Sequence, residues 1–242
     1  MLRYLELIIA LSLGLLASWP ANAQTTQSEE PTACTAIDIL IDPDTTMLKQ
    51  ATAANERLRK VYPKGFALDA SHQPHISCLQ RFVKTAELDH VYAAIDKVLA
   101  EEKPATWKLK AHKYYYIPFN DLGLAGIVIE PTDDLIRIQK KFIDAIEPYT
   151  VKSGTKAAFV TTKEDPEINQ PTIDYVKSFV PAATGEKFNP HVTIGLASED
   201  YLKQMLGEKF EAFTFSPAGI SVYQLGNLGM AQKKLKSWEL KH

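Results

Sequence analysis

Apolar and polar positions alternate with two different periods in the first hundred residues. In residues 36–42 (AIDILID) apolar side chains alternate with acidic ones, as in a β-strand. Residues 47–62 and 86–102 each place apolar side chains three or four positions apart, which is the spacing of one helix face. Residues 75–83, between these two helices, again favour a strand. The pattern therefore predicts strand, helix, strand, helix.

The middle of the chain continues this alternation and then loses it. Two strands at 107–117 and 124–130 are followed by a helix at 133–146, whose acidic first turn suits the helix dipole. From residue 150 to residue 187 the periodicity is weak, and we treat this segment as an insertion. Within it we expect a short strand at 157–162, a loop at 163–171 and a short helix at 172–180.

The last part of the chain returns to a regular pattern. A strand at 188–196 leads into a helix at 199–206, with Ser198 as its N-cap. Three further strands are expected at 210–215, 219–226 and 233–240, with residues 226–229 in the last turn. Because a strand–helix–strand unit occurs twice, we predict an α+β fold with two similar lobes, formed by one domain over residues 35–242.

The N-terminus has the pattern of a secretory signal. Residues 7–17 form an apolar run, and the small residues of Ala21–Ala23 (ANA) follow it, so we expect residues 1–23 to be removed. The alternative is an uncleaved anchor, for which an apolar run of this length is short. Residues 24–34 are polar and are expected to be a disordered lead. The prediction is an exported, periplasmic protein without stable membrane association after cleavage.

Charge and cysteine content narrow the classes of partner. The chain has 27 Lys and Arg against 29 Asp and Glu, a net charge of −2, and no basic run. A long nucleic acid is therefore not expected, whereas a small anionic substrate or an oligonucleotide end is compatible with this charge. Only Cys34 and Cys78 are present, and an oxidising compartment leaves open either a bridge between them or two free thiols.

One short pattern occurs twice, in residues 72–80 (HQPHISCLQ) and in residues 188–196 (FNPHVTIGL). Each copy contains Pro, His, an apolar residue, a hydroxyl residue and another apolar residue, in that order. Because successive strand side chains point to opposite faces, His75 shares a face with Ser77, and His191 shares a face with Thr193. The preceding prolines restrict the backbone at the start of each strand.

Two imidazoles and two hydroxyls in one cleft are suited to cleaving a phosphodiester. One neutral imidazole can take a proton from water while a protonated one gives a proton to the leaving oxygen. The hydroxyls can donate hydrogen bonds to oxygens that gain charge in the transition state. This chemistry needs no metal or cofactor. The chain contains no G-x-S-x-G, no Gly-rich phosphate loop and no H-E-x-x-H.

The two H-Φ-[ST]-Φ motifs, HISC at 75–78 and HVTI at 191–194, resemble those of the 2H phosphoesterase superfamily. That superfamily includes bacterial RNA 2′,5′-ligase-like proteins and 2′,3′-cyclic phosphodiesterases. The resemblance implies two β-sheet lobes with helices outside and a central cleft. It also implies that His75 and His191 are the catalytic pair and that Ser77 and Thr193 bind the phosphate. The segment 150–187 is long for the family and is expected to be a lid or a substrate-selecting insertion.

Further side chains are candidates for binding the substrate. Aromatic rings stack on nucleobases, and charged side chains near the motifs would attract a phosphate. The alternative is that the rings pack in the core and that the charges are solvated. The candidates are Tyr114, Tyr115, Tyr116, Phe188, Tyr223, Arg81 and Lys187.

Three functions remain in competition at this point. The first is a metal-independent phosphoesterase acting on a 2′,3′-cyclic phosphate or a related small phosphodiester, as a monomer. The second is a non-catalytic protein that binds a nucleotide or an oligonucleotide end in the same cleft. The third is an exported metal-binding protein that uses His72, His75 and His191, although no nearby Cys or carboxylate completes a ligand set.

Overall fold

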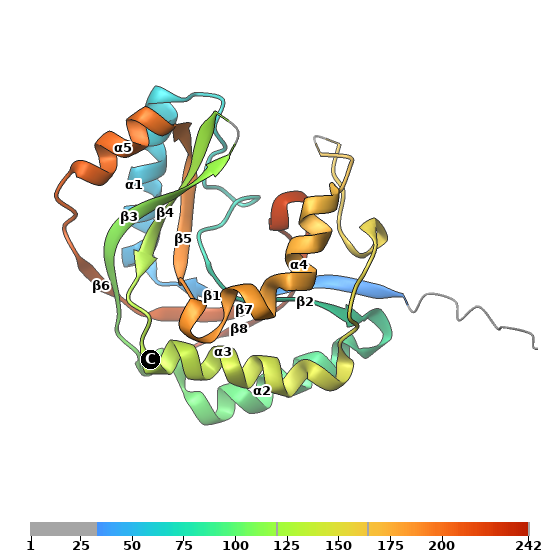
Figure 1. The fold of residues 1–242 in the computed structure, drawn as a ribbon. Helices are drawn as coiled ribbons and strands as arrows, with labels where there is room; N and C mark the ends of the chain where they lie inside the picture. The colour runs from blue at the N-terminus through green and yellow to red at the C-terminus, as the bar shows by residue number, and fades with distance from the viewer. Residues whose placement is uncertain (1–32, 120, 164, 242) are drawn as a thin grey trace, which may run out of the picture. The chain divides into compact units, whose positions relative to one another are not determined.

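Two four-stranded antiparallel sheets, with helices around them, form the framework of the protein (Figure 1). The computed structural model describes residues 33–119, 121–163 and 165–241 of the chain. The predicted α+β class is confirmed. The predicted signal peptide and most of the polar lead lie outside the described residues. Cys34, which we had placed at the end of that lead, is instead the first residue of a strand.

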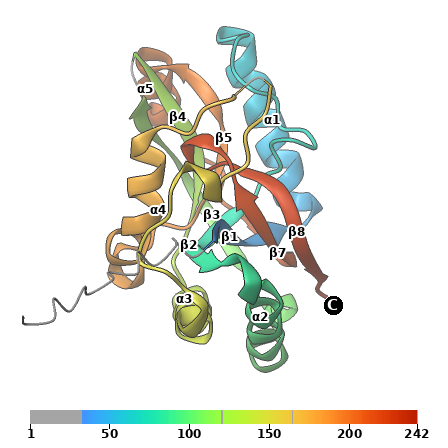
Figure 2. The same cartoon turned by 90° about the vertical axis from the view of Figure 1, so that its right-hand side faces the viewer.

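The first sheet has the strand order β2-β1-β7-β8. Its central strand carries three buried isoleucines, Ile37, Ile39 and Ile41, on one face. Helices α2 and α3 lie together on one side of this sheet (Figure 2). The bounds of these elements are β1 Cys34–Pro43, β2 Ile76–Lys84, β7 Pro217–Leu225, β8 Ala231–Glu239, α2 Leu88–Glu102 and α3 Asp133–Ile146.

The second sheet has the strand order β5-β4-β3-β6 and is covered by α1 and α5. Helix α1 leaves the first sheet and packs on β5, where Asn55 Nδ2 donates hydrogen bonds to the carbonyls of Ile194 (2.8 Å) and Phe66 (3.0 Å). Gly195 has φ +137° and a Cβ there would lie 2.9 Å from Asn55 Nδ2, so glycine is required. The bounds are β3 Leu109–Phe119, β4 Leu122–Ile129, β5 His191–Ser198, β6 Phe213–Phe215, α1 Thr45–Val61 and α5 Glu199–Gly207.

The two lobes do not correspond to the two halves of the chain. The first sheet is completed by β7 and β8 from the C-terminal end, and the second sheet takes β3 and β4 from the middle of the chain. Each sheet does contain one of the two strand–helix–strand units with its motif, β1-α1-β2 in the first and β5-α5-β6 in the second, but the pattern did not assign the other strands to a sheet. Strand pairing over long sequence distances decides this, and local periodicity carries no record of it.

Most predicted helices begin at the side chains that the sequence favours. Asp44 accepts hydrogen bonds from the backbone N–H groups of Thr46 (2.9 Å) and Met47 (3.3 Å) at the start of α1. Ser198 caps α5 as predicted, by accepting from the N–H of Tyr201 (3.4 Å). Short 3₁₀ helices fill several connections, at Thr85–Glu87, Pro104–Thr106, Glu147–Tyr149, Lys156–Ala158, Gly185–Lys187 and Asn227–Gly229.

The segment 150–187 is a packed part of the first lobe. The predicted helix is present and longer, as α4 Gln170–Ala183, and it packs on β2. The predicted strand at 157–162 is wrong, because residues 156–158 form a 3₁₀ helix and no ladder forms with β7, which the segment meets through Val160 N to Leu225 O (2.9 Å) and Gln224 Nε2 to Ala158 O (2.9 Å). The segment closes a second hydrophobic cluster made of Ala36, Phe82, Ala158, Phe159, Ile168, Val176 and Leu225.

The two cysteines are free. Cys34 pairs with Lys84 in the β1–β2 ladder, whereas Cys78 lies six residues away along β2. At the rise of a strand this separates the two residues by about 20 Å, which is far beyond the reach of a disulfide. Among the described residues, no helix is long and apolar enough to cross a membrane.

Candidate active site

The two motifs occupy the edge strands β2 and β5, which lie against each other. Both strands contain a β-bulge at the same motif position. In β2 the ladder passes from Ile39↔Leu79 to Leu40↔Ser77, so Cys78 is the extra residue. In β5 the ladder likewise skips Ile194. Bulges re-aim side chains beside active sites, and here the bulge at Cys78 places Ser77 and Gln80 on the same face as Asp38.

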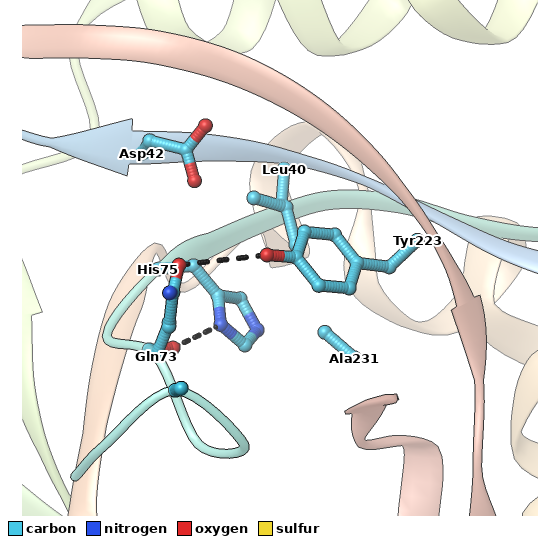
Figure 3. Close-up of a pocket in the computed structure, with 7 residues that line it drawn as sticks. Leu40, Asp42, Gln73, His75, Tyr223 and Ala231 are labelled. Carbon is cyan, nitrogen blue, oxygen red and sulfur yellow. Dashed lines mark hydrogen bonds between the residues drawn. The ribbon is translucent and has the colours of Figure 1, made fainter. Parts of the chain in front are cut away.

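The two imidazoles are held in the same way. His75 Nδ1 lies 2.7 Å from the carbonyl oxygen of Gln73 (Figure 3), and His191 Nδ1 lies 2.8 Å from the carbonyl oxygen of Asn189. A carbonyl oxygen only accepts, so each Nδ1 carries a proton and each neutral ring keeps Nε2 as a free base. The residue between each pair is the motif proline, which restricts the turn that brings the carbonyl under the ring.

The imidazoles of His75 and His191 have different electrostatic surroundings. Burial lowers the pKa of His191, and positive charge on His75 lowers it further, against the hydrogen bond that the ring donates to the carbonyl of Asn189. Asp38 lies under the first motif, bound to Ser77, and positive charge on His75 lowers the pKa of its carboxyl group against the larger effect of burial. The site therefore favours a neutral His191.

The two hydroxyls differ more than their motif positions suggest. Ser77 Oγ donates a hydrogen bond of 2.6 Å to Asp38 Oδ2. The hydroxyl of Thr193 makes no hydrogen bond with any described residue, and its cross-strand neighbour is Gly126. Thr193 is thus ready to donate to a ligand, whereas the proton of Ser77 is already in use.

Asp38 is a buried acid under the first motif that sequence reasoning missed. It stands in a cross-strand row with Gln80 on β2 and Tyr223 on β7. Gln80 Nε2 donates to Asp38 Oδ2 (3.0 Å) and to the carbonyl of Gly229 (3.3 Å). Burial raises the pKa of Asp38 to about 6, against the charge of His75 and the two side-chain hydrogen bonds. The alternation AIDILID did show that Asp38 and the isoleucines occupy opposite faces, which was the available signal.

Only one of the three consecutive β3 tyrosines reaches either motif histidine. The ring of Tyr115 lies edge-to-face on His191, with centroids 4.9 Å apart. Its two neighbours point to the opposite face, where Tyr114 packs on Phe210 (4.8 Å) and Tyr116 reaches Glu199 of α5 (3.5 Å). The structure therefore places Tyr115 at the site and the candidates Tyr114 and Tyr116 away from it.

The remaining candidates divide in a similar way. Tyr223 lines a small pocket with His75, and its hydroxyl lies 3.5 Å from Gln73 Oε1 (Figure 3). Phe188 is buried in the main core. Arg81 pairs with Glu147 (2.6 Å) on the opposite face of β2, and Lys187 Nζ donates to the carbonyl of Pro181 (2.9 Å).

Tyr175 on α4 is a second side chain that sequence reasoning missed. Its side chain is 47% exposed, and a Cβ on Gly229 would lie 3.8 Å from its ring. Burial and the negative charge of Asp38 raise the pKa of Tyr175, and burial, with a smaller effect of Tyr175, raises the pKa of Tyr115. An aromatic ring from the inserted segment therefore lies beside Gly229, next to Gln80 of the Asp38 group.

His72 contacts side chains of its own loop and neither motif histidine. Its ring stacks on Phe66 with centroids 4.8 Å apart, and its Nδ1 lies 3.0 Å from Ser71 Oγ. Across the part of the chain that the structure describes, no group of three or more His, Cys, Asp or Glu residues is placed to hold a metal ion.

No protein-family model and no curated protein matches the chain. Solved structures do. TT0787 of Thermus thermophilus is 14% identical, with a TM-score of 0.49 over 85% of this chain and 98% of that one. E. coli LigT complexed with 3′-AMP is 12% identical, with a TM-score of 0.34 over 87% and 100%. Kluyveromyces marxianus Usb1 is 9% identical, with a TM-score of 0.40 over 86% and 98%.

Identities this low do not carry an activity from one chain to another. Any activity of this chain has to be argued from the side chains of its own site.

Proposed function

We propose that this protein is a metal-independent phosphoesterase that hydrolyses a 2′,3′-cyclic phosphate or a related small phosphodiester. One observation carries the proposal. Two edge strands that lie against each other present imidazoles in the same tautomer, each with Nδ1 bound to the carbonyl two residues earlier and Nε2 free. A protein that only binds its ligand has no need of two titrating groups set in the same way.

In this proposal the two rings take opposite roles. His191, whose pKa is lowered, is the base, and His75, beside Asp38, is the acid. Water attacks phosphorus as its proton passes to His191 Nε2. The bond from phosphorus to one ribose oxygen breaks, and that oxygen takes a proton from His75 Nε2. The products are a phosphomonoester, a neutral His75 and a protonated His191, which a proton transfer through solvent resets.

The hydroxyl groups and aromatic rings set the substrate class. Thr193 has a hydroxyl free to donate to a phosphate oxygen, which is an acceptor. Tyr115 and Tyr175 supply ring surfaces beside the motifs for a nucleobase. With no basic excess in the chain, a small nucleotide or an oligonucleotide end fits better than a long nucleic acid.

The decisive experiment is a product assay on purified protein. Nucleoside 2′,3′-cyclic phosphates and short 2′,5′- and 3′,5′-linked oligonucleotides are incubated with wild type, with His75→Ala, with His191→Ala and with the double variant. Each single change should lower kcat/KM by about 10²–10⁴-fold, and the double change should cost much less than the product of the two.

A matched control is His90→Ala on α2, since this exposed ring stacks on Tyr149 and bonds Glu87, away from both motifs. Chelator should leave the rate unchanged. Hydrolysis that survives the double histidine change would disprove the proposed chemistry, and ligand binding without turnover would favour the binding protein instead.

We also propose that the protein is exported, because of its N-terminal sequence. The apolar run at 7–17 followed by Ala21–Ala23 supports removal of residues 1–23. N-terminal sequencing of the full-length gene product from a Gram-negative host should begin at Gln24 in the periplasmic fraction. Recovery of the uncut chain in the membrane fraction would favour an anchor.

A further inference from the structure

The hydroxyl of Ser77 has one proton, and the structure shows where it goes. Ser77 Oγ lies 2.6 Å from Asp38 Oδ2, and a carboxylate oxygen only accepts. In this state Ser77 offers lone pairs alone to the cleft. Phosphate oxygens are themselves acceptors, so Ser77 cannot hold a phosphate while Asp38 is ionised.

The group of side chains under Ser77 lacks a donor. Asp38 Oδ1 and Gln80 Oε1 are both buried, and neither has a hydrogen-bond partner among the described residues. The amide protons of Gln80 are taken by Asp38 Oδ2 and by the carbonyl of Gly229. Unsatisfied buried acceptors are rare because each costs desolvation free energy. A proton on Asp38 would add one donor to this group.

We propose that Asp38 takes up a proton when the cleft binds an anionic phosphodiester, and that the neutral Asp38 frees the Ser77 hydroxyl to donate to the phosphate. This inference rests on the proposed function for the identity of the anion. Asp38 acts through Ser77 and is a positioning residue. On binding, the phosphate replaces the Asp38 carboxylate as the negative charge beside His75.

The groups around Asp38 agree with uptake of a proton near neutrality. From β2 it faces His75, Ser77 and Gln80, and Cys78 lies on the same strand within reach of its charge. Burial already raises the pKa of Asp38 to about 6 in the empty cleft, and a nearby anion raises a carboxyl pKa further.

From the other elements, Asp38 faces aromatic side chains. Tyr223 of β7 is its cross-strand partner, and Tyr175 of α4 has its pKa raised in part by the Asp38 charge. Lys234 of β8 lies over the Tyr223 ring, 5.4 Å from the centroid. The positive charge that acts on Asp38 is that of His75, which donates a proton to the leaving oxygen in the proposed mechanism.

In the described residues, the second motif has no carboxyl group in the place that Asp38 takes beside the first motif. The position across from Thr193 is Gly126, and the position across from Leu196, which corresponds to Gln80, is Leu124. No carboxyl group takes the proton of Thr193 among the residues described. Only the first motif therefore couples phosphate binding to protonation.

Asp38→Asn is the direct test, because the amide keeps the shape of the carboxylic acid and can donate to Ser77 Oγ permanently. The KM for a nucleoside 2′,3′-cyclic phosphate, which does not titrate in this range, is measured from about pH 6 to about pH 8. In the wild type KM should rise by up to about tenfold per pH unit above the Asp38 pKa, whereas in Asp38→Asn it should stay within about twofold.

The matched control is Asp42→Asn. Asp42 is on the same strand as Asp38, lines the small pocket beside His75 and accepts a 2.6 Å hydrogen bond from Ser221, but it does not contact a motif hydroxyl. It should keep the wild-type pH dependence of KM. A loss in Asp38→Asn by the same factor at every pH would show a merely structural role and would overturn the inference.

A second measurement needs no turnover. The side-chain carboxyl carbons of ¹³C-labelled aspartate are titrated by NMR in the free protein and in sulfate, a tetrahedral anion that does not titrate in this range, with Asp38→Asn identifying the signal. The Asp38 midpoint should move upward with sulfate, and an unmoved midpoint would overturn the inference. If the midpoint moves but no cyclic phosphate is hydrolysed, the proposed function fails and the proton linkage of Asp38 stands.

Discussion

The ring of Tyr115 meets the ring of His191 edge-to-face, with centroids 4.9 Å apart. The residue across from Tyr115 on β4 is Gly126, and a Cβ there would lie 2.4 Å from Tyr115 Cε1. The glycine leaves the space through which the tyrosine reaches the imidazole. Tyr115 therefore packs against one side of the imidazole of His191, the proposed base.

Removing the Tyr115 ring should reduce activity without removing the base, His191. An edge-to-face aromatic contact is worth about 0.5–1.5 kcal/mol beyond burial, so Tyr115→Ala should lower kcat/KM by about 2- to 10-fold, and Tyr115→Phe should stay close to wild type. Gly126→Ala should resemble Tyr115→Ala because the added methyl displaces the ring. Tyr114→Ala, on the other face, should lower Tm and spare kcat/KM. A loss in Tyr115→Phe as large as in Tyr115→Ala would contradict a packing role.

The pH dependence of kcat/KM should be bell-shaped, because the reaction needs one neutral and one protonated imidazole. The base must be neutral, so the rate falls as pH drops through its pKa. Since burial and His75 lower the pKa of His191, the acidic limb should lie below the ordinary histidine value of about 6.5. Steady-state kinetics over the whole range checks this, and an acidic limb above the ordinary value would reverse the assignment of base and acid.

Asp38→Asn should stabilise the protein above neutrality. The folded pKa of Asp38 is raised from 3.8 to about 6, so its contribution to stability is fully present below the unfolded value and is lost as pH rises to the folded one. That difference corresponds to up to about 3 kcal/mol at higher pH. Urea unfolding should show Asp38→Asn as the more stable form at about pH 8 and nearly equal to wild type at about pH 4. A less stable variant at the higher pH would contradict the raised pKa.

Tyr175 should contribute to binding of the nucleobase. Stacking of a base on an aromatic ring is worth about 1–3 kcal/mol, so Tyr175→Ala should raise KM for a nucleoside 2′,3′-cyclic phosphate by at least about fivefold. Tyr175→Phe should keep the wild-type KM. Ribose 2′,3′-cyclic phosphate, which has no base, should be insensitive to both changes. An equal effect of Tyr175→Ala on the two substrates would rule out stacking.

A chain that ends at Tyr149 should neither fold cooperatively nor act. It lacks β7 and β8 of the first sheet and β5 and β6 of the second, so both sheets lose two of their four strands. Circular dichroism during thermal unfolding should show no sharp transition, and added fragment 150–242 should be required for any recovery of hydrolysis. Activity of the truncated chain alone would refute a site shared between β2 and β5.

Some of this molecule was predictable because local patterns specify it. Helix α3 was predicted with its observed bounds, Asp133–Ile146, since its apolar stripe and its acidic first turn are both local features. The faces of His75 and Ser77, and of His191 and Thr193, follow from the two-residue period of a strand. The repeated motif therefore pointed to both imidazoles without any knowledge of the fold.

Register and bulges could not be predicted from these patterns. The residue type does not distinguish the three tyrosines at 114–116. Only the pairing of β3 with β4 places Tyr115 on the face of His191. The bulge at Cys78 brings Ser77 and Gln80, three residues apart, onto one face above Asp38. A bulge depends on how two strands fit together and leaves no reliable trace in one of them.

The sequence by itself determined the elements, the two motifs and the kind of chemistry they support. The tertiary structure alone decided that β7 and β8 complete the first lobe, that α4 brings Tyr175 to the cleft, and that a buried Asp38 takes the Ser77 proton. The physical reason is the sequence distance over which each kind of interaction acts. Propensity and amphipathic period act over a few residues, whereas pairing and burial join side chains such as Asp38 and Tyr175 that are far apart in the chain.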